Sequence, residues 1–325
     1  MKKNIAILMG GYSSEYDISI KSGNIVYNHL SKEIYNTYRV IISKDSWYHL
    51  NDNDEKKPID RSDFSLTENN NKIQFDAAFN TIHGTPGEDG LLQAFLQLLN
   101  IPQTSCDFYT SAVTFNKRDC ISILKPYNIP TATNYFINKG DTINVDHIIE
   151  TVGLPCFIKA NRSGSSFGVL KAHNKEDITP AINEAFNVDN EIIIESFLSG
   201  TEISVGVACL DGVPTVMGIT EIVTENDFFD YEAKYLGKSE EITPARLTQE
   251  QNEEVEALTL KVYKSLNMKG FARTDFIFNN GKPYFLEINT NPGLSEASIL
   301  PQQSKIKGIS LEKLFGNEIE ECLKN

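Results

Sequence analysis

The sequence predicts an α/β segment with a parallel sheet at its N-terminus, followed by a longer region of mixed α+β structure. In the first third, short apolar strands alternate with helix-like stretches, whereas strand and helix signals are mixed further along. Loops rich in Gly, Ser and Pro follow several of the apolar strands. Ligands of open parallel sheets bind beyond the carboxyl ends of strands, so the N-terminal loops Gly10–Glu15 and His83–Gly90 are candidate binding segments.

The bulk composition excludes several classes of partner. The chain has 325 residues, enough for two or three lobes, and a net charge of −14 without a basic cluster, which argues against nucleic acid and anionic membrane. Its five cysteines are scattered and form no Cys-x-x-Cys pair, which argues against a disulfide framework or structural zinc. No apolar run could span a bilayer, and Met1-Lys2-Lys3 leads directly into a short strand, so we expect a cytoplasmic protein.

The first domain is expected over residues 1–104. Apolar runs predict strands over Ile5–Met9, Tyr38–Ile42 and Ala77–Ile82, with a helix from about Ser19 to Leu30. A second helix is predicted because five apolar residues fall on one helical face: Leu91, Leu92, Phe95, Leu98 and Leu99. This order of elements is typical of a parallel sheet covered by helices on both faces.

Two further domains are expected over residues 105–195 and 196–325. The second should contain helices near residues 111–124 and 176–187, and strands over Cys156–Lys159 and Ile192–Glu195. The third should contain strands over Glu202–Leu210, Ala272–Phe278 and Tyr284–Ile288, and helices near residues 248–266 and 310–323. Its aromatic, charged segment Phe228–Arg246 is too long for a simple connector and is predicted to be a mobile lid.

Three oxygen-bearing side chains predict a metal site. Glu287 and Asn289 alternate along one strand and therefore point to the same face. If the strand that carries Asp275 lies alongside, three oxygen ligands converge, and such ligands suit Mg²⁺. An isolated Glu-x-Asn favours solvent-facing strand positions over a metal site, but here it continues into the turn Thr290–Gly293.

A lysine at the end of a strand predicts phosphate binding. Lys159 ends the apolar strand Phe157–Lys159 and is followed by the Gly/Ser loop 163–168, where unobstructed backbone N–H groups could approach phosphate. The loop is not a P-loop, because no Gly-x-x-x-x-Gly-Lys-Ser/Thr occurs in the chain. Taken alone, it could be a flexible turn.

The linear order of these elements resembles the ATP-grasp superfamily. Over nearly its whole length the chain is similar to the D-alanine–D-alanine ligase family. The most specific matches are five short segments: Gly10-Gly-Tyr-Ser-Ser-Glu15, Ile82-His-Gly-Thr-Pro-Gly-Glu-Asp-Gly90, Tyr231-Glu-Ala-Lys-Tyr235, Arg273-Thr-Asp275, and Asn289-Thr-Asn-Pro-Gly293 followed by Ser298. The resemblance implies an ATP-grasp fold behind an N-terminal parallel-sheet domain, with the loop 228–246 as part of the C-terminal lobe.

The resemblance also implies how ATP and metal are bound. ATP contacts are implied for eight residues: Lys117, Lys159, Ser166, Glu195, Ser196, Leu198, Glu202 and Lys234. The metal would be Mg²⁺, with Mn²⁺ as an alternative and two ions in the site, held by Asp275, Glu287 and Asn289. Ser196-Phe197 replaces the family's usual Lys-Trp, which should change little because backbone groups read adenine there.

Substrate contacts are implied in the same way. Glu15 would orient the amino group of the first D-alanine, and His83 would lie near its carboxylate. Ser165 and Tyr235 would connect Glu15 to the mobile loop. The remaining assignments are Arg273 and the N–H of Gly293 for the oxyanion, and Ser298 with the N–H of Ile299 for the second carboxylate. Taken singly, His83 could cap a strand, Tyr235 could be a packing aromatic, and Ser298 could start a helix.

The implied activity is the ATP-dependent joining of two D-alanine molecules through an acyl phosphate, for peptidoglycan precursors, the cell wall and cell shape. The resemblance also implies a homodimer. Alternatives are a D-alanine–D-serine or D-alanine–D-lactate ligase, another ATP-grasp carboxylate–amine ligase, or a nucleotide-binding regulatory protein without turnover. Glu296 stands where many relatives carry a small polar residue, so we expect it to affect the second subsite.

Overall fold

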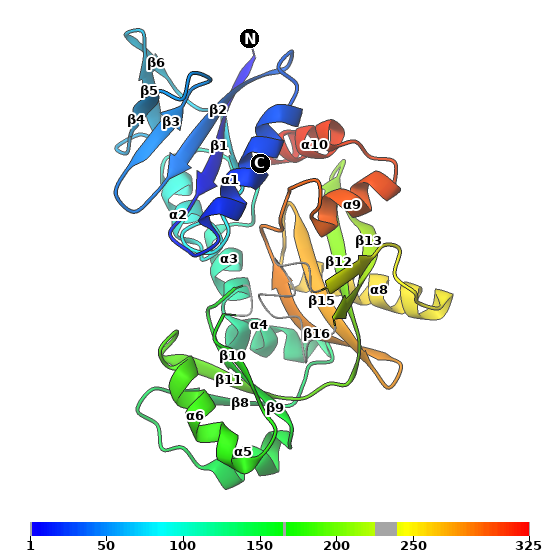
Figure 1. Cartoon of the computed structure of the whole chain (residues 1–325). Coiled ribbons are helices and arrows are strands. Elements are labelled where there is room, and N and C mark those ends of the chain that lie inside the picture. Colours follow the sequence, from blue (N-terminus) through cyan, green and yellow to red (C-terminus); the bar gives the residue numbers. More distant parts are fainter. Residues whose placement is uncertain (1, 165–166, 225–238, 325) are drawn as a thin grey trace.

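The computed structural model describes residues 2–164, 167–224 and 239–324. Figure 1 shows three sheets, of which the N-terminal and central ones lie at opposite ends of the molecule, with the C-terminal sheet beside both. The expected domain boundaries at 104/105 and 195/196 stay predictions.

The N-terminal sheet has seven strands in the order β6-β5-β4-β3-β2-β1-β7. Their bounds are β1 Lys3–Gly10, β2 Tyr35–Ile42, β3 Trp47–Leu50, β4 Lys56–Asp60, β5 Ser65–Glu68, β6 Asn71–Ile73 and β7 Ala77–Asn80. The predicted parallel sheet is confirmed for β1, β2 and β7, whose pairings are parallel. The strands β3 to β6 form an antiparallel extension that the sequence analysis did not anticipate.

Two helices cover opposite faces of this sheet, as predicted. Helix α1 (Tyr16–His29) packs through Val26 on the face that carries Ile5, and α2 (Leu91–Leu98) packs through Leu92 on the face that carries Ala6. The antiparallel extension depends on tight turns. Between β5 and β6, Asn69 and Asn70 have φ angles of +50° and +62°, as in a hairpin turn whose backbone twist matches the strands.

The central sheet has the order β10-β9-β11-β8, and all its pairings are antiparallel. The strands are β8 Asn134–Asn138, β9 Cys156–Ala160, β10 Val169–Ala172 and β11 Glu191–Ser196. Helices α5 (Val145–Val152) and α6 (Lys175–Ala185) pack on it (Figure 1) and enclose a mainly aliphatic core whose residues all lie between residues 135 and 194.

The C-terminal sheet is antiparallel, with the order β14-β13-β12-β15-β16. The strands are β12 Gly200–Leu210, β13 Val213–Thr224, β14 Ser239–Ile242, β15 Ala272–Asn279 and β16 Lys282–Asn289. Helix α8 (Gln249–Ser265) covers the face that carries Val205, and α9 (Ile299–Ile306) covers the other face, where Gln303 donates to the Ser204 carbonyl at 3.1 Å. Helix α10 (Leu311–Leu323) joins the core of the N-terminal sheet.

Two predicted segments differ from the structure. The single helix expected near 111–124 is two helices, α3 (Phe108–Phe115) and α4 (Lys117–Leu124), followed by a 3-10 turn over Lys125–Tyr127. They are separated by Asn116, whose backbone is extended and whose side-chain Oδ1 caps α4 by accepting from the Asp119 N–H. The predicted loop ending at Arg246 contains β14, and its residues 228–238 lie outside the described residues.

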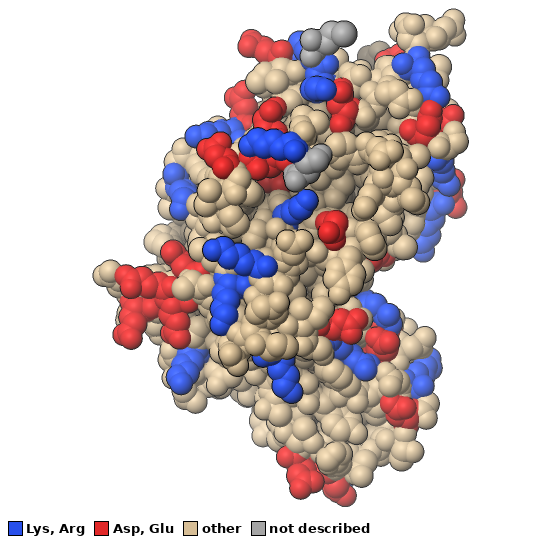
Figure 2. Space-filling view, turned by 180° about the vertical axis from the view of Figure 1, so that it is seen from behind, with Lys and Arg blue, Asp and Glu red and all other residues tan. Residues whose placement is uncertain are grey.

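Figure 2 shows lysine and arginine dispersed among acidic residues over the rear face, with the densest acidic cluster over α8. That helix contributes Glu250, Glu253, Glu254 and Glu256. In residues 2–164, 167–224 and 239–324, no helix is both long enough and apolar enough to cross a bilayer.

Candidate active site

The antiparallel pair β15–β16 carries the centre of the site. Asp275 is the register partner of Glu287, and Arg273 is the register partner of Asn289. Arg273 and Asp275 are two residues apart on one strand, so the two cross-strand pairs share one face of the sheet. The predicted convergence of Asp275, Glu287 and Asn289 on neighbouring strands is thus confirmed; their role as metal ligands stays a prediction.

The donor set is chemically suited to Mg²⁺, but Asp275 has competing partners. Its carboxylate accepts from Ser204 Oγ at 2.5 Å, and from Arg273 Nε at 3.0 Å and NH2 at 2.8 Å. Asn289 Oδ1 accepts from the Asn291 N–H at 2.8 Å. Two carboxylates and one amide oxygen form a hard-oxygen set. Arg273 neutralises Asp275 in this arrangement, so a cation held here would compete with the guanidinium for its oxygens.

A cleft between the central and C-terminal sheets contains the two predicted phosphate-contacting lysines. Lys159 Nζ lies 2.6 Å from Glu195 Oε2, across the β9–β11 pair. Lys117 Nζ donates to the Ser163 carbonyl at 2.6 Å and lies 3.5 Å from Glu287 Oε2. Burial alone would lower the pKa of Lys159, but Glu195, Glu287 and Glu202 outweigh it and raise that pKa, so the ammonium stays charged.

The walls of this cleft divide into an apolar part and a charged part. The apolar walls come from Ala132, Phe157, Val169, Leu198, Ile277 and Leu286. The polar lining comes from Lys117, Lys159, Ser163, Glu195, Ser196, Glu202, Asp275 and Glu287. Such a cleft can hold a flat aromatic base between apolar surfaces and an anionic tail against lysines. All predicted ATP-contacting residues that the structure describes line it.

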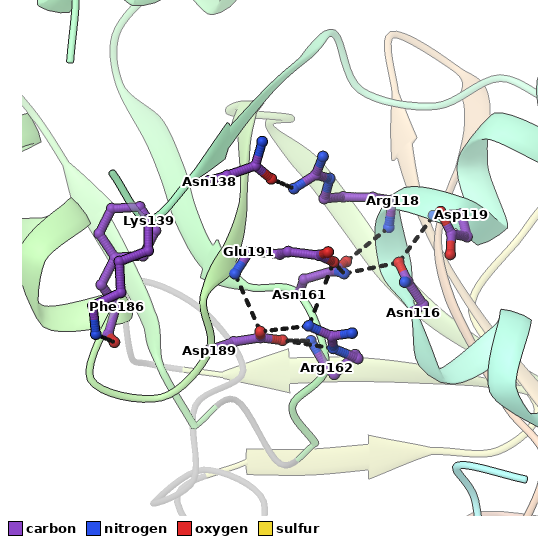
Figure 3. Close-up of polar contacts among 10 residues, drawn as sticks. All are labelled: Asn116, Arg118, Asp119, Asn138, Lys139, Asn161, Arg162, Phe186, Asp189 and Glu191. Carbon is purple, nitrogen blue, oxygen red and sulfur yellow. Dashed lines mark hydrogen bonds and ion pairs between the residues drawn. The ribbon is translucent and has the colours of Figure 1, made fainter. Parts of the chain in front are cut away.

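A buried asparagine holds the base of this cleft together (Figure 3). Asn161 follows β9 and is fully buried; its Nδ2 donates to Asn116 Oδ1 and to Glu191 Oε2, both at 2.8 Å. Its Oδ1 accepts from the Arg118 N–H at 2.9 Å, and its carbonyl from the Lys117 N–H at 3.4 Å. Asn161 therefore satisfies N–H groups at the start of α4, where Lys117 is located.

A second hollow, next to the N-terminal sheet, collects the predicted substrate residues. Glu15, His83, Arg273, Gly293, Ser298 and Ile299 all line it. Ser298 is the N-cap of α9, and its Oγ lies 2.8 Å from Ser295 Oγ, so free helix N–H groups are available to a carboxylate. Burial lowers the pKa of the His83 imidazole, whereas the nearby Glu15 carboxylate acts to raise that pKa. The Nε2 atom of His83 lies 3.3 Å from Ser22 Oγ.

The Gly/Ser loop approaches the N-terminal domain at Glu15. A Cβ placed on Gly164 would lie 3.1 Å from Glu15 Oε2, so these two segments meet as the sequence predicts. The other proposed partners of Glu15, Ser165 and Tyr235, lie outside the described residues, as do Ser166 and Lys234. The expected contacts of these four residues stay predictions.

Sequence reasoning missed Glu88, although it lies within the quoted His83–Gly90 match. Its carboxylate is buried and accepts from the Gly84 N–H at 2.6 Å. Burial and nearby Glu15 raise the pKa of Glu88 to about 8. The sequence signal that could have revealed Glu88 is a glutamate between glycines in a loop after an apolar strand. Nothing in the sequence indicated that the Glu88 side chain turns inward. Lys21 and Glu241, which line the substrate hollow, were missed as well.

Glu296 does not lie in the substrate hollow, where its expected effect on the second subsite would place it. Its side chain is exposed, and it is absent from the residues that line the substrate hollow, whereas its neighbours Ser295 and Ala297 line it. The expected effect of this carboxylate on the second subsite is therefore wrong for this structure. The turn that precedes α9 directs residue 296 outward.

The hollows are continuous. The nucleotide cleft shares Lys117, Ser163 and Glu287 with a middle hollow, which also contains Glu88. That middle hollow shares Glu15, Arg273 and Asn289 with the substrate hollow. A nucleotide phosphate and a small carboxylate could therefore meet over β15–β16. This three-sheet architecture, with a lysine-lined cleft joined to a small polar pocket, is that of the ATP-grasp class of ligases.

Comparison with known proteins identifies the family to which this chain belongs within the ATP-grasp class. Residues 4–106 match the family model described as D-ala D-ala ligase N-terminus, and residues 123–320 match the model described as D-ala D-ala ligase C-terminus. The chain belongs to the D-alanine–D-alanine ligase family. A D-alanine–D-alanine ligase of Christiangramia forsetii is 58% identical over 323 residues, which cover 99% of each chain.

Solved structures agree with this membership. A VanG D-Ala:D-Ser ligase from Enterococcus faecalis superposes with a TM-score of 0.88 at 29% identity, over 99% of this chain and 100% of that one. A D-alanine–D-alanine ligase from Bacillus anthracis complexed with ATP has a TM-score of 0.79 at 28% identity, over 99% of this chain and 98% of that one.

Proposed function

We propose that this protein joins two D-alanine molecules to D-alanyl-D-alanine, with ATP converted to ADP and phosphate, for peptidoglycan precursor synthesis in the cytoplasm. The observation that carries the proposal is that the middle hollow connects the nucleotide cleft to the substrate hollow, since it shares lining residues with each of them. Two relatives of 58% identity that are named D-alanine–D-alanine ligases support D-alanine as the second substrate, rather than D-serine or D-lactate.

The first step places anionic groups against one another. The carboxylate of the first D-alanine attacks the γ-phosphate of ATP, which forms an acyl phosphate and releases ADP. Lys117 and Lys159 offset the phosphate charge, and Glu15 holds the ammonium of the same D-alanine. Mg²⁺ bound by Asp275, Glu287 and Asn289 would neutralise phosphate oxygens.

In the second step, the amine of the second D-alanine attacks the acyl carbon and phosphate leaves. Its carboxylate binds at the N-terminus of α9, where Ser298 and the Ile299 N–H are available. Arg273 and the Gly293 N–H stabilise the tetrahedral oxyanion. A Cβ at Gly293 would lie 2.7 Å from Ser298 Oγ, so the absence of a side chain there keeps the two anion contacts close together.

The test is phosphate release from ATP with D-alanine alone, and with D-alanine plus D-serine or D-lactate, with products identified by mass spectrometry. D-Alanyl-D-alanine is the expected main product. A main product containing D-serine or D-lactate would assign the chain to that variant activity. No amino-acid-dependent phosphate release would refute ligase function.

We also propose a homodimer, as the family resemblance implies. Leu91 and Leu98 lie seven residues apart on α2 and are 62% and 82% exposed, and Tyr109 at the start of α3 is 62% exposed. Apolar side chains spaced in this way on one helix face form a surface that a second copy could cover. Light scattering should give a dimer mass, and Leu98→Glu should give the monomer mass. A monomeric unaltered protein would contradict the proposal.

A further inference from the structure

A separate cleft lies between the N-terminal and C-terminal units. Its walls come from α2 and the segment 100–107 on one side, and from the β12–β13 turn, the end of α8 and α10 on the other. The cleft has a volume of about 630 Å³, and no residue lining it also lines the three hollows of the active site. The proposed reaction gives this cleft no role.

The cleft contains a buried carboxyl group without a hydrogen-bond partner. Glu318 on α10 is 1% exposed, and its Oε2 has no partner among the described residues. A Cβ at Gly270 would lie 2.6 Å from Glu318 Oε1 and 2.1 Å from the Thr104 carbonyl oxygen. Residue 270 is glycine, with φ at +66°, because the Thr104 carbonyl oxygen and the Glu318 carboxyl lie too close to its Cα for a side chain.

A second unpartnered acceptor lies in the same cleft. Gln93 is 2% exposed; its amide nitrogen donates to the Gly87 carbonyl, but its Oε1 has no partner among the described residues. Buried polar atoms in folded proteins are nearly always hydrogen-bonded, so two unsatisfied acceptors in one cleft indicate a missing donor. The charged residues of the lining are Asp107, Glu318 and Glu321, against Lys269, so the excess charge is negative.

We propose that this cleft binds a small organic cation, a primary ammonium group on a short apolar body, with Glu318 as its counter-ion. An ammonium has three donors and no acceptor, which matches a lining with unpartnered oxygens. An anion would meet the carboxylates of Asp107 and Glu321 and the buried carboxyl of Glu318. A metal ion fits poorly, because the described residues contain no group of three His, Cys, Asp or Glu placed to hold one. Met268, Pro102 and Pro214 supply apolar surface for the carbon body.

The proton balance of the site follows from its surroundings. Burial, with Glu321 nearby, raises the pKa of Glu318 well above its usual value, so the empty carboxyl holds its proton more readily than an exposed one. Burial also raises the pKa of the other groups near it, the Tyr263 hydroxyl and the thiols of Cys106, Cys209 and Cys322, which stay uncharged near neutral pH. Asp107, Glu321 and Lys269 also line the cleft, and Lys324 forms an ion pair with Glu321. An ammonium ion that binds beside Glu318 should therefore release a proton.

The test is isothermal titration calorimetry of the full chain with n-butylammonium, in the presence of ADP and D-alanine so that the active site is occupied. We expect saturable binding that Glu318→Gln weakens by about ten- to a hundredfold, the effect of losing a charged hydrogen bond. Glu312→Gln, an exposed position on the same helix, is the matched control and should leave the affinity unchanged.

Two further measurements do not depend on a variant. Neutral n-butanol should bind much more weakly than n-butylammonium. Titrations in buffers with different ionisation enthalpies should reveal proton release on binding. Equal affinity in wild type and Glu318→Gln, equal affinity for the alcohol, absence of proton release, or no saturable binding of n-butylammonium would each overturn the proposal. These measurements record binding alone, so they can fail while the proposed ligase activity holds.

Discussion

Replacing Asn161 with alanine should loosen the base of the nucleotide cleft. The change removes three side-chain hydrogen bonds, to Asn116, Glu191 and the Arg118 N–H, at a fully buried position. A neutral bond contributes about 0.5–1.5 kcal/mol, and a buried group left unsatisfied costs about 1–3 kcal/mol. Glu191 keeps part of its solvation and lies 3.5 Å from Arg162, so we expect a total loss of about 2–5 kcal/mol in the free energy of unfolding.

The same change should weaken ATP binding, because Asn161 holds the first turn of α4 and Lys117 extends from that turn. We expect the KM for ATP to rise several-fold, with a smaller effect on the KM for D-alanine. Urea unfolding and steady-state kinetics measure the two effects. Lys175→Ala is the control, because its ion pair with Asp146 is exposed on both sides and such pairs contribute little to stability. If Asn161→Ala is no less stable than Lys175→Ala and binds ATP normally, the bracing role is refuted.

Three other predictions address the middle and substrate hollows. Glu287→Gln should lower kcat/KM by at least about a hundredfold without lowering Tm, because it removes a charge from the predicted Mg²⁺ ligands. The control Glu254→Gln, on α8, should change neither quantity. Near-normal turnover of Glu287→Gln at saturating Mg²⁺ would contradict the ligand role. Folding raises the pKa of Glu88 from 4.5 to about 8, so its protonated form contributes stability that is complete below about pH 4.5 and is lost as pH rises towards and through 8. Glu88→Gln should therefore gain Tm relative to wild type between pH 5 and 9, and a constant difference in Tm would contradict this. Glu296→Ser should leave D-alanine saturation unchanged, and a shifted second-site KM would mean that the exposed side chain reaches the substrate after all.

Periodicity was enough to predict the elements that carry the site. The apolar runs at Ile5–Met9 and Cys156–Lys159, and the alternation at Glu287–Asn289, each correspond to a strand, and Lys159, Glu287 and Asn289 line the hollows of the site. Local signals failed where a single polar residue overrides a pattern. Asn116 interrupts an otherwise continuous helix pattern, because its side chain satisfies the first turn of the next helix.

Contacts between distant segments could not be predicted in the same way. The Arg273–Asp275 pairing depends on side-chain rotamers, and the inward turn of Glu88 depends on the backbone N–H of Gly84. The antiparallel strands β3 to β6 are short, and although Ile59 and Leu66 are buried, their apolar patterns are too brief to predict a strand from periodicity. The roles of Ser298 and Gly293 came from family resemblance, since a serine before a helix normally indicates only a cap.

The separation of the hydrophobic cores has a mechanical consequence. Phe79 of the N-terminal sheet packs on Phe271 and Phe315, with ring centroids 6.3 and 5.8 Å apart, so the N-terminal and C-terminal units share one core and should tilt together. The central sheet encloses its own core between residues 135 and 194. Lys159 belongs to that sheet, whereas the helix that carries Lys117 packs against the C-terminal unit. Asn161 and Ile193 already connect the two units. A nucleotide bound by both lysines would add a further connection, and its arrival should reduce their relative motion in solution scattering or fluorescence distance measurements.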